Sequence, residues 1–122
     1  MERERFEELV AAALEGLPPP FAERLENIAV TVQDWPTRDQ LAETRVRHRQ
    51  NLLGLYEGIP LPKRGRSYNM VLPDKITIFQ RPIEMHCRSD AKIIRQIQDT
   101  VQHEIAHYFG ISDARLRELR KY

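Results

Sequence analysis

The architecture of this chain follows from residues 89–113, which read SDAKIIRQIQDTVQHEIAHYFGISD. Ser89 can cap a helix at the start of this stretch, and Gly110 can end it in a left-handed conformation. Between them, the apolar side chains fall within about one 60° sector of a wheel drawn at about 100° per residue. These side chains are Ile94, Ile97, Val101, Ile105 and Tyr108. The stretch therefore predicts one helix of roughly twenty residues, the longest element of the chain.

The predicted helix carries the motif His103-Glu104-Ile105-Ala106-His107. Because residues four apart lie one above the other on a helix, both imidazoles can reach one metal ion. The two histidines lie opposite the apolar stripe, so an ion held there keeps an open coordination position, which catalysis needs. Glu104 lies about 100° round the helix from His103, so its carboxylate reaches a water on the metal rather than the metal itself. This is the position of a general base.

Asp113 is the expected third metal ligand. Gly110 tolerates a positive φ, so the chain can leave the helix there and turn back toward the histidines. Asp113 then falls in the first turn of a last short helix capped by Ser112, where it offers a hard oxygen ligand. Two neutral imidazoles and one carboxylate around Zn²⁺ leave the site positive, which lowers the pKa of a bound water toward roughly 7. We therefore expect one Zn²⁺ ion on His103, His107 and Asp113.

Two helices and a strand are predicted in the first third of the chain. Residues 2–16 place apolar side chains at spacings of three and four, which predicts an amphipathic helix that ends before Pro18. A second, short helix is expected over residues 21–26. Residues 28–32 alternate between large apolar side chains and smaller or polar ones, which is typical of a half-buried strand.

A third helix is predicted from a capping box. Thr37 is followed three residues later by Gln40, so a helix is expected to start there. This helix would turn Leu41 and Ala42 inward and break near Asn51.

Two further strands complete a small sheet. Residues 52–56 and 75–80 have strand-like composition, and the second of these strands would close before Pro82. Residues 59–74, rich in Pro and Gly, form the longest expected loop. Because the sequence has no internal repeat and no boundary that divides it, we expect a single α+β domain over residues 1–122.

The composition excludes several classes of protein. At 122 residues, the chain is long enough for one core and too short for two full domains. It has no apolar run long enough to span a membrane and no secretion signal at its start, so we expect a cytoplasmic protein without a membrane partner. The lone Cys87 excludes an internal disulfide, and the formal net charge of +1 gives no general attraction to nucleic acid.

The pattern H-E-x-x-H-x-x-G-x-x-D over residues 103–113 resembles the small bacterial zincin-like metallopeptidases with a minimal zincin fold. The likeness continues through residues 53–61, 72–78 and 81–84 and covers most of residues 28–120. The resemblance implies a small mixed β-sheet packed against a long metal-binding helix. It also implies that His103, His107 and Asp113 bind zinc and that Glu104 polarises the attacking water.

The chain departs from larger zincins in two respects. Met70 and Met85 both precede the motif, so no Met-containing turn follows Asp113. The length also leaves no room for a second lobe to form the far wall of a cleft. These departures predict that the protein cleaves a narrow set of short or extended peptides, or that a partner completes its cleft. An edge strand could hold such a substrate by main-chain pairing.

Three functions are compatible with the motif. The first is a zinc-dependent peptidase-like hydrolase of peptide or protein substrates, in which Glu104 takes the proton of the attacking water. The second is a metal-dependent endoribonuclease, because a bacterial ribosomal-RNA-processing family has a related spacing with Gly in place of Glu104. Glu104 and Asp113 argue against it, so we do not expect a nucleic acid partner. The third is a non-catalytic metal-binding interaction module. The sequence does not indicate an oligomeric state.

Other side chains have a structural and a functional interpretation. His86 and Cys87 could ligate a second metal, but a buried thiol beside a surface histidine accounts for them better. The basic clusters at residues 45–49 and 63–66 could meet phosphate, although solvated surface is the simpler account. Three tyrosines are candidate donors to an oxyanion, each with packing as the alternative, and the long loop favours the second of them. These are Tyr56, Tyr68 and Tyr108.

Overall fold

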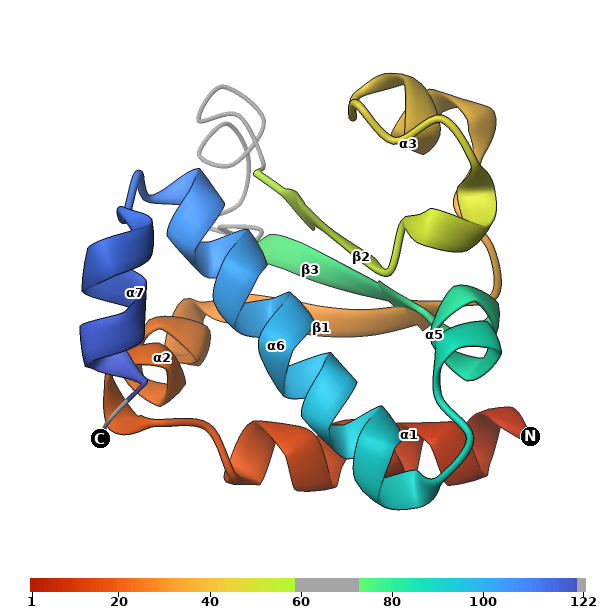
Figure 1. The fold of residues 1–122 in the computed structure, drawn as a ribbon, viewed down its shortest axis with the longest axis horizontal. Helices are drawn as coiled ribbons and strands as arrows, with labels where there is room; N and C mark the ends of the chain where they lie inside the picture. Colours follow the sequence, from red (N-terminus) through yellow and green to blue (C-terminus); the bar gives the residue numbers. More distant parts are fainter. Residues whose placement is uncertain (59–72, 121–122) are drawn as a thin grey trace, which may run out of the picture.

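The structure is a computed structural model that describes residues 1–58 and 73–120. Within these residues, three strands form one mixed sheet in the order β1-β3-β2 (Figure 1). The central strand β3 (Asp74–Phe79) pairs in parallel with β1 (Ile28–Gln33) and antiparallel with β2 (Gly54–Glu57). In the described part of the chain, β1 and β2 are therefore the two edges of the sheet.

Two long helices pack together against one face of this sheet. Helix α1 (Arg3–Glu15) lies alongside α6 (Asp90–Tyr108), and α6 runs diagonally past β2 and β3 (Figure 1). Alternate strand residues point toward these helices, as the period of two requires. The core is built from the buried side chains of both helices and of β3: Phe6, Leu9, Val10, Ala13, Ile76, Ile78, Ile93, Ile97, Val101 and Ile105.

The remaining elements are short. They are α2 (Pro19–Arg24), the 3₁₀ turn η1 (Leu25–Asn27), α3 (Arg38–Ala42), the 3₁₀ turn η2 (Arg49–Asn51), α5 (Gln80–His86) and α7 (Asp113–Leu119). Helix α7 joins the core through Leu116 and Leu119. The α+β class, with a small mixed sheet packed against one long helix, is thus confirmed.

Several local predictions are also confirmed. The first helix and the long helix end within one or two residues of their expected bounds. Thr37 and Gln40 form the capping box, and Ser89 and Ser112 cap α6 and α7. Gly110 has a φ of +69°, which L side chains rarely adopt.

Helix α5 was not predicted, and it shortens the preceding strand. Pro82 was expected to close the strand after Gln80, but Gln80 is the first residue of α5 and β3 ends at Phe79. Pro82 is the third helical residue, where the missing N–H costs no intrahelical hydrogen bond. The second strand is also displaced, because it begins at Gly54 rather than at residue 52.

Helix α3 is much shorter than the sequence indicated. It ends at Ala42, whereas the prediction carried it toward Asn51. The hydroxyl of Thr44 donates to the Leu41 carbonyl at 2.9 Å and accepts from the Val46 N–H at 3.1 Å. These side-chain bonds compete with helical backbone bonds, so the chain leaves the helix here.

The inward-facing side chain of α3 is Gln40, not Leu41 or Ala42. Gln40 is buried, and its amide bonds to Gln33 on β1 and to Glu57 on β2. Leu41 is half-buried and Ala42 is exposed. The helix therefore attaches to the sheet through a satisfied polar network rather than through apolar packing.

The apolar stripe of α6 differs from prediction at both ends. Ile93 is buried, whereas Ile94 is only half-buried. Tyr108, expected on the stripe, is 51% exposed and stacks on Tyr56. Tyr108 lies beside the edge strand β2, on the side of α6 where Glu104 and Tyr108 both contact Tyr56, rather than in the core beneath the helix.

Candidate metal centre

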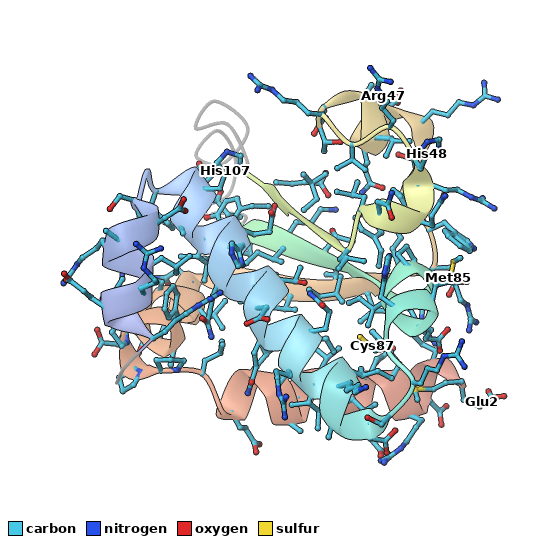
Figure 2. All side chains as sticks on the ribbon, viewed as in Figure 1. Glu2, Arg47, His48, Met85, Cys87 and His107 are labelled. Carbon is cyan, nitrogen blue, oxygen red and sulfur yellow. The ribbon has the colours of Figure 1, made fainter. Side chains whose placement is uncertain are left out.

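The C-terminal half of α6 presents two histidines to solvent. Val101, Ile105 and Ala106 are buried beneath the helix, and this orientation leaves the side chains of His103 and His107 exposed on the same face. Figure 2 shows His107 at the C-terminal end of α6, near the end of β2. The sequence prediction for these two residues agrees with where the helix places them.

His103 is oriented by its own helix. Its Nδ1 lies 2.8 Å from the carbonyl oxygen of Asp99. The same Nδ1 lies 3.2 Å from a guanidinium nitrogen of Arg120. A carbonyl only accepts and a guanidinium only donates, so the two contacts compete for Nδ1, and the shorter one to Asp99 is made when Nδ1 carries the ring proton. Nε2 then keeps the lone pair that a metal ion needs.

Glu104 faces the edge strand rather than open solvent. Its Oε1 accepts a hydrogen bond from the backbone N–H of Tyr56 at 2.9 Å. Burial raises the pKa of the Glu104 carboxyl, and the Tyr56 N–H and the two neighbouring histidines oppose that rise. The second carboxylate oxygen has no hydrogen-bond partner among the described residues, so it can accept a proton.

Three aromatic rings connect the last turn of α6 to β2. The rings of Tyr56 and Tyr108 stack with centroids 3.9 Å apart and planes 20° apart. Phe109 packs edge-on against both rings, at 6.1 Å from Tyr56 and 5.2 Å from Tyr108. Together with the Tyr56–Glu104 hydrogen bond, these contacts fix the position of the motif relative to the edge strand.

Asp113 follows the predicted turn and begins α7. The Ile111 N–H bonds the Ala106 carbonyl at 2.8 Å, and the Ser112 hydroxyl accepts from the N–H of Arg115 at 3.1 Å. Asp113 itself is exposed. Over residues 1–58 and 73–120, no three His, Cys, Asp or Glu side chains form a group that could hold a metal ion. The structure thus places two imidazoles on one face but does not bring Asp113 into a set with them.

The two imidazoles fit a zinc ion by their chemistry. They are four residues apart on one helix face, and neither is paired with a carboxylate in the described part of the chain. Histidine nitrogen is a preferred zinc ligand, and the backbone carbonyl on Nδ1 of His103 is the partner that usually orients such a ligand.

A cleft of about 690 Å³ opens beside the motif. Glu104, His107 and Tyr108 form one wall, and β2 contributes its edge. Residues 43–46, from the segment after α3, also line this cleft, so a short segment rather than a second lobe contributes to its wall. The cleft is lined by Glu43, Thr44, Arg45, Val46, Leu52, Gly54, Leu55, Tyr56, Glu104, His107 and Tyr108.

A family model for zincin-like metallopeptidases matches residues 25–122, which include the whole motif. The chain belongs to this family. A search of curated proteins found no match. As a zincin-like metallopeptidase it comes from a family that binds zinc and acts on peptides or proteins, which agrees with the exposed histidine pair on α6. The family match begins after α1 and α2, yet α1 packs directly on α6, the helix that carries the motif of this zincin-like chain.

The other candidate residues divide into three groups. Cys87 is buried, its burial raises the thiol pKa, and the neighbouring His86 is exposed, so the structural interpretation of this pair is confirmed. Tyr56 and Tyr108 stack on each other beside the motif, while Tyr68 lies outside the described residues. Residues 63–66 and Met70 also lie outside them.

No described helix is long and apolar enough to cross a membrane.

Two features of the zincin-like site were not found from the sequence. The first is the Tyr56 N–H that holds Glu104, which depends on β2 being the edge strand next to α6. The second is the wall at residues 43–46. Thr44 was the available signal for that wall, because a hydroxyl near a helix end commonly bonds the backbone and ends the helix.

Proposed function

We propose that this zincin-like chain is a zinc-dependent peptidase that hydrolyses a peptide lying along β2. The observation that carries the proposal is the Glu104 carboxylate, held at 2.9 Å by the Tyr56 N–H between the exposed histidine pair and the edge strand. A general base must lie within reach of both the attacking water and the substrate. Glu104 lines the cleft in which such a substrate would bind.

His103, His107 and Asp113 are the proposed zinc ligands. The first two share a helix face, and Asp113 follows the left-handed turn at Gly110. When bound, zinc supplies a Lewis acid that polarises the scissile carbonyl and makes the attacking water more acidic. We propose Asp113 as the oxygen ligand because it is the first residue of α7 and is exposed on the helix that follows the motif.

Glu104 has two tasks in this mechanism. One oxygen is fixed by the Tyr56 N–H, so the carboxylate cannot rotate freely. The second oxygen takes a proton from the attacking water and passes it to the leaving amine. Burial raises the pKa of this carboxyl, which makes the carboxylate a stronger base toward the attacking water.

The edge strand β2 holds the substrate. A peptide in the cleft lies against β2, whose outer edge pairs with no other strand within the described residues, although the Tyr56 N–H already donates to Glu104. Main-chain pairing with such an edge holds an extended peptide independently of its sequence. Gly54 permits this arrangement, because a Cβ there would lie 2.5 Å from Cγ2 of Thr100 and would push β2 away from α6.

We also propose that residues 1–122 act as one domain. The family match starts at residue 25, but Phe6, Leu9 and Ala13 of α1 are buried in the same core as Ile97 and Val101 of the metal helix. Removal of α1 would expose this face of α6, so α1 belongs to the folding unit that supports the site.

The proposal is tested by digesting a peptide library and a structured RNA with zinc-loaded protein. We expect new peptide ends by mass spectrometry, intact RNA, and loss of cleavage on chelation with recovery on adding zinc. His103→Ala should bind less than one zinc per chain, whereas His86→Ala, an exposed histidine outside the cleft, should bind as much as wild type. Cleavage that continues in a verified zinc-free sample, or cleavage of the RNA alone, would contradict the proposal.

A further inference from the structure

The segment between α3 and η2 is strongly basic. Over residues 43–49, called the basic wall from here on, three arginines oppose the single acidic residue Glu43. Arg45, Arg47 and Arg49 are all exposed. Figure 2 shows Arg47 at the outer tip of this segment, with His48 beside it, pointing away from the body of the molecule.

Within the described residues, Arg45 and Arg47 of the basic wall are not neutralised by a neighbouring carboxylate as Arg5 is. On α1, Arg5 donates to Glu8 at 2.7 Å and to Asp90 at 2.6 Å. Arg45 and Arg47 form no ion pair with any carboxylate in residues 1–58 and 73–120. Their charge is therefore available to a ligand, and guanidinium groups bind carboxylates through paired, charge-assisted hydrogen bonds.

The basic wall is also one side of the cleft. Arg45 lines the cleft together with Thr44 and Val46, across from Glu104 and His107. A peptide in the cleft would therefore have the edge strand on one side and the arginines on the other. The main chain would pair with β2, and side chains that point away from the sheet edge would meet the wall.

We propose that the basic wall binds acidic side chains of the substrate, so that the peptidase prefers peptides with Asp or Glu beside the scissile bond. This inference rests on the proposed function, since it concerns the same cleft. It assigns Arg45, which lines the cleft, as the specificity-determining residue, with Arg47 at the outer tip adding positive charge beside it. Electrostatic complementarity of this kind selects among partners more than it adds affinity, and it weakens as salt is added.

A peptide fits the wall better than RNA does. Proteins that bind single-stranded RNA commonly stack its bases on aromatic rings. The guanidinium of Arg49 already lies over Trp35, at 4.2 Å from the ring centroid, and in the cleft the rings of Tyr56 and Tyr108 already stack on each other. The formal net charge of +1 also lacks the general excess of positive charge that backbone binding of nucleic acid requires.

The test measures binding separately from cleavage. Glu104→Gln protein loaded with zinc is titrated into a fluorescein-labelled peptide with Glu on both sides of a central apolar pair. A matched peptide carries Gln in place of each Glu, and a labelled RNA oligonucleotide is the third probe. We expect the Glu peptide to bind about tenfold more tightly than the Gln peptide at low salt.

Two charge-matched double variants locate the effect. Arg45→Gln with Arg47→Gln removes two arginines of the wall, and Arg88→Gln with Arg95→Gln removes two exposed arginines that do not line the cleft. The first pair should abolish the preference for the Glu peptide, and the second should leave it within about twofold of wild type. Equal affinity for the two peptides, an equal loss in both double variants, or tighter arginine-dependent binding of the RNA would overturn the inference.

Cleavage by the active protein distinguishes this inference from the proposed function. If wild-type protein cleaves both peptides at equal rates, the inference fails and the proposed function stands. If the Glu peptide binds through Arg45 and Arg47 but no peptide is cleaved, the proposed function fails and the basic wall remains a binding surface for acidic peptides. A higher kcat/KM for the Glu peptide, lost in the first double variant, supports both.

Discussion

Replacing Gly54 with alanine should destabilise the contact between the edge strand β2 and helix α6. A Cβ at this position would lie 2.5 Å from Cγ2 of Thr100 and 3.2 Å from the carbonyl oxygen of Thr77. Thr100 is buried and β-branched, so it cannot rotate away easily. Overpacking of this kind costs about 1–3 kcal/mol in the free energy of unfolding. At about 4 °C per kcal/mol for a chain of this size, the Tm should fall by about 4–12 °C.

Thermal unfolding followed by circular dichroism measures this loss, with two further variants as controls. Gly16→Ala is the matched glycine, because the one tight contact of its Cβ would be with the flexible end of Gln98, and its Tm should change by less than about 4 °C. Thr100→Ser removes the clashing methyl and keeps the hydroxyl that accepts from Gln96. The double variant of Gly54 and Thr100 should therefore be more stable than the sum of the single losses by about 1 kcal/mol or more. Wild-type stability of Gly54→Ala, or strict additivity in the double variant, would refute the close approach of β2 to α6.

Four further outcomes follow from particular contacts. Cys87 is buried with a raised thiol pKa, so a disulfide reagent should modify it about 100-fold more slowly in the folded protein than in denaturant; equal rates would disprove its burial. Tyr108→Leu removes the stack on Tyr56 and should lower the free energy of unfolding by urea by about 1 kcal/mol, whereas Tyr108→Phe should change it little. An equal decrease in both variants would show that the ring contact is unimportant. The Arg3 hydrogen bond lowers the pKa of the Asp34 carboxyl in the folded protein. The stability that this bond gives is therefore present above the pKa of Asp34 in the unfolded chain and is lost as pH falls through the pKa in the folded protein. The difference in Tm between wild type and Asp34→Asn should close in acid, and a difference that widens would be inconsistent with this pairing. Zinc should raise the Tm of wild type but not of His103→Ala with His107→Ala, and an equal rise would move the metal to other ligands.

The long helix and its motif were predictable because two independent patterns coincide on it. The apolar stripe determines which face of α6 is buried, and the spacing of His103 and His107 places both on the opposite face. The caps at Ser89 and Gly110 then determine where the helix starts and ends. Each of these properties depends on residues close in sequence, which is why sequence alone was sufficient.

The rest of the site depends on contacts between distant segments. The bond from Tyr56 to Glu104 joins residues 48 positions apart, and it forms only because β2 is an edge strand beside α6. The wall at residues 43–46 exists because Thr44 ends α3 early and Gln40 attaches that helix to the sheet. Helix α5 was missed because Pro82 was interpreted as a break, although proline is compatible with a first helical turn.

The rate of peptide hydrolysis by Glu104→Gln at a measured zinc content equal to that of wild type tests the proposed mechanism most directly. The substitution keeps the shape of the side chain and can still accept from the Tyr56 N–H, but it removes the group that takes the proton. We expect one zinc per chain in both proteins and a kcat at least about 100-fold lower in the variant. Hydrolysis at the wild-type rate with zinc bound would show that Glu104 is not the general base.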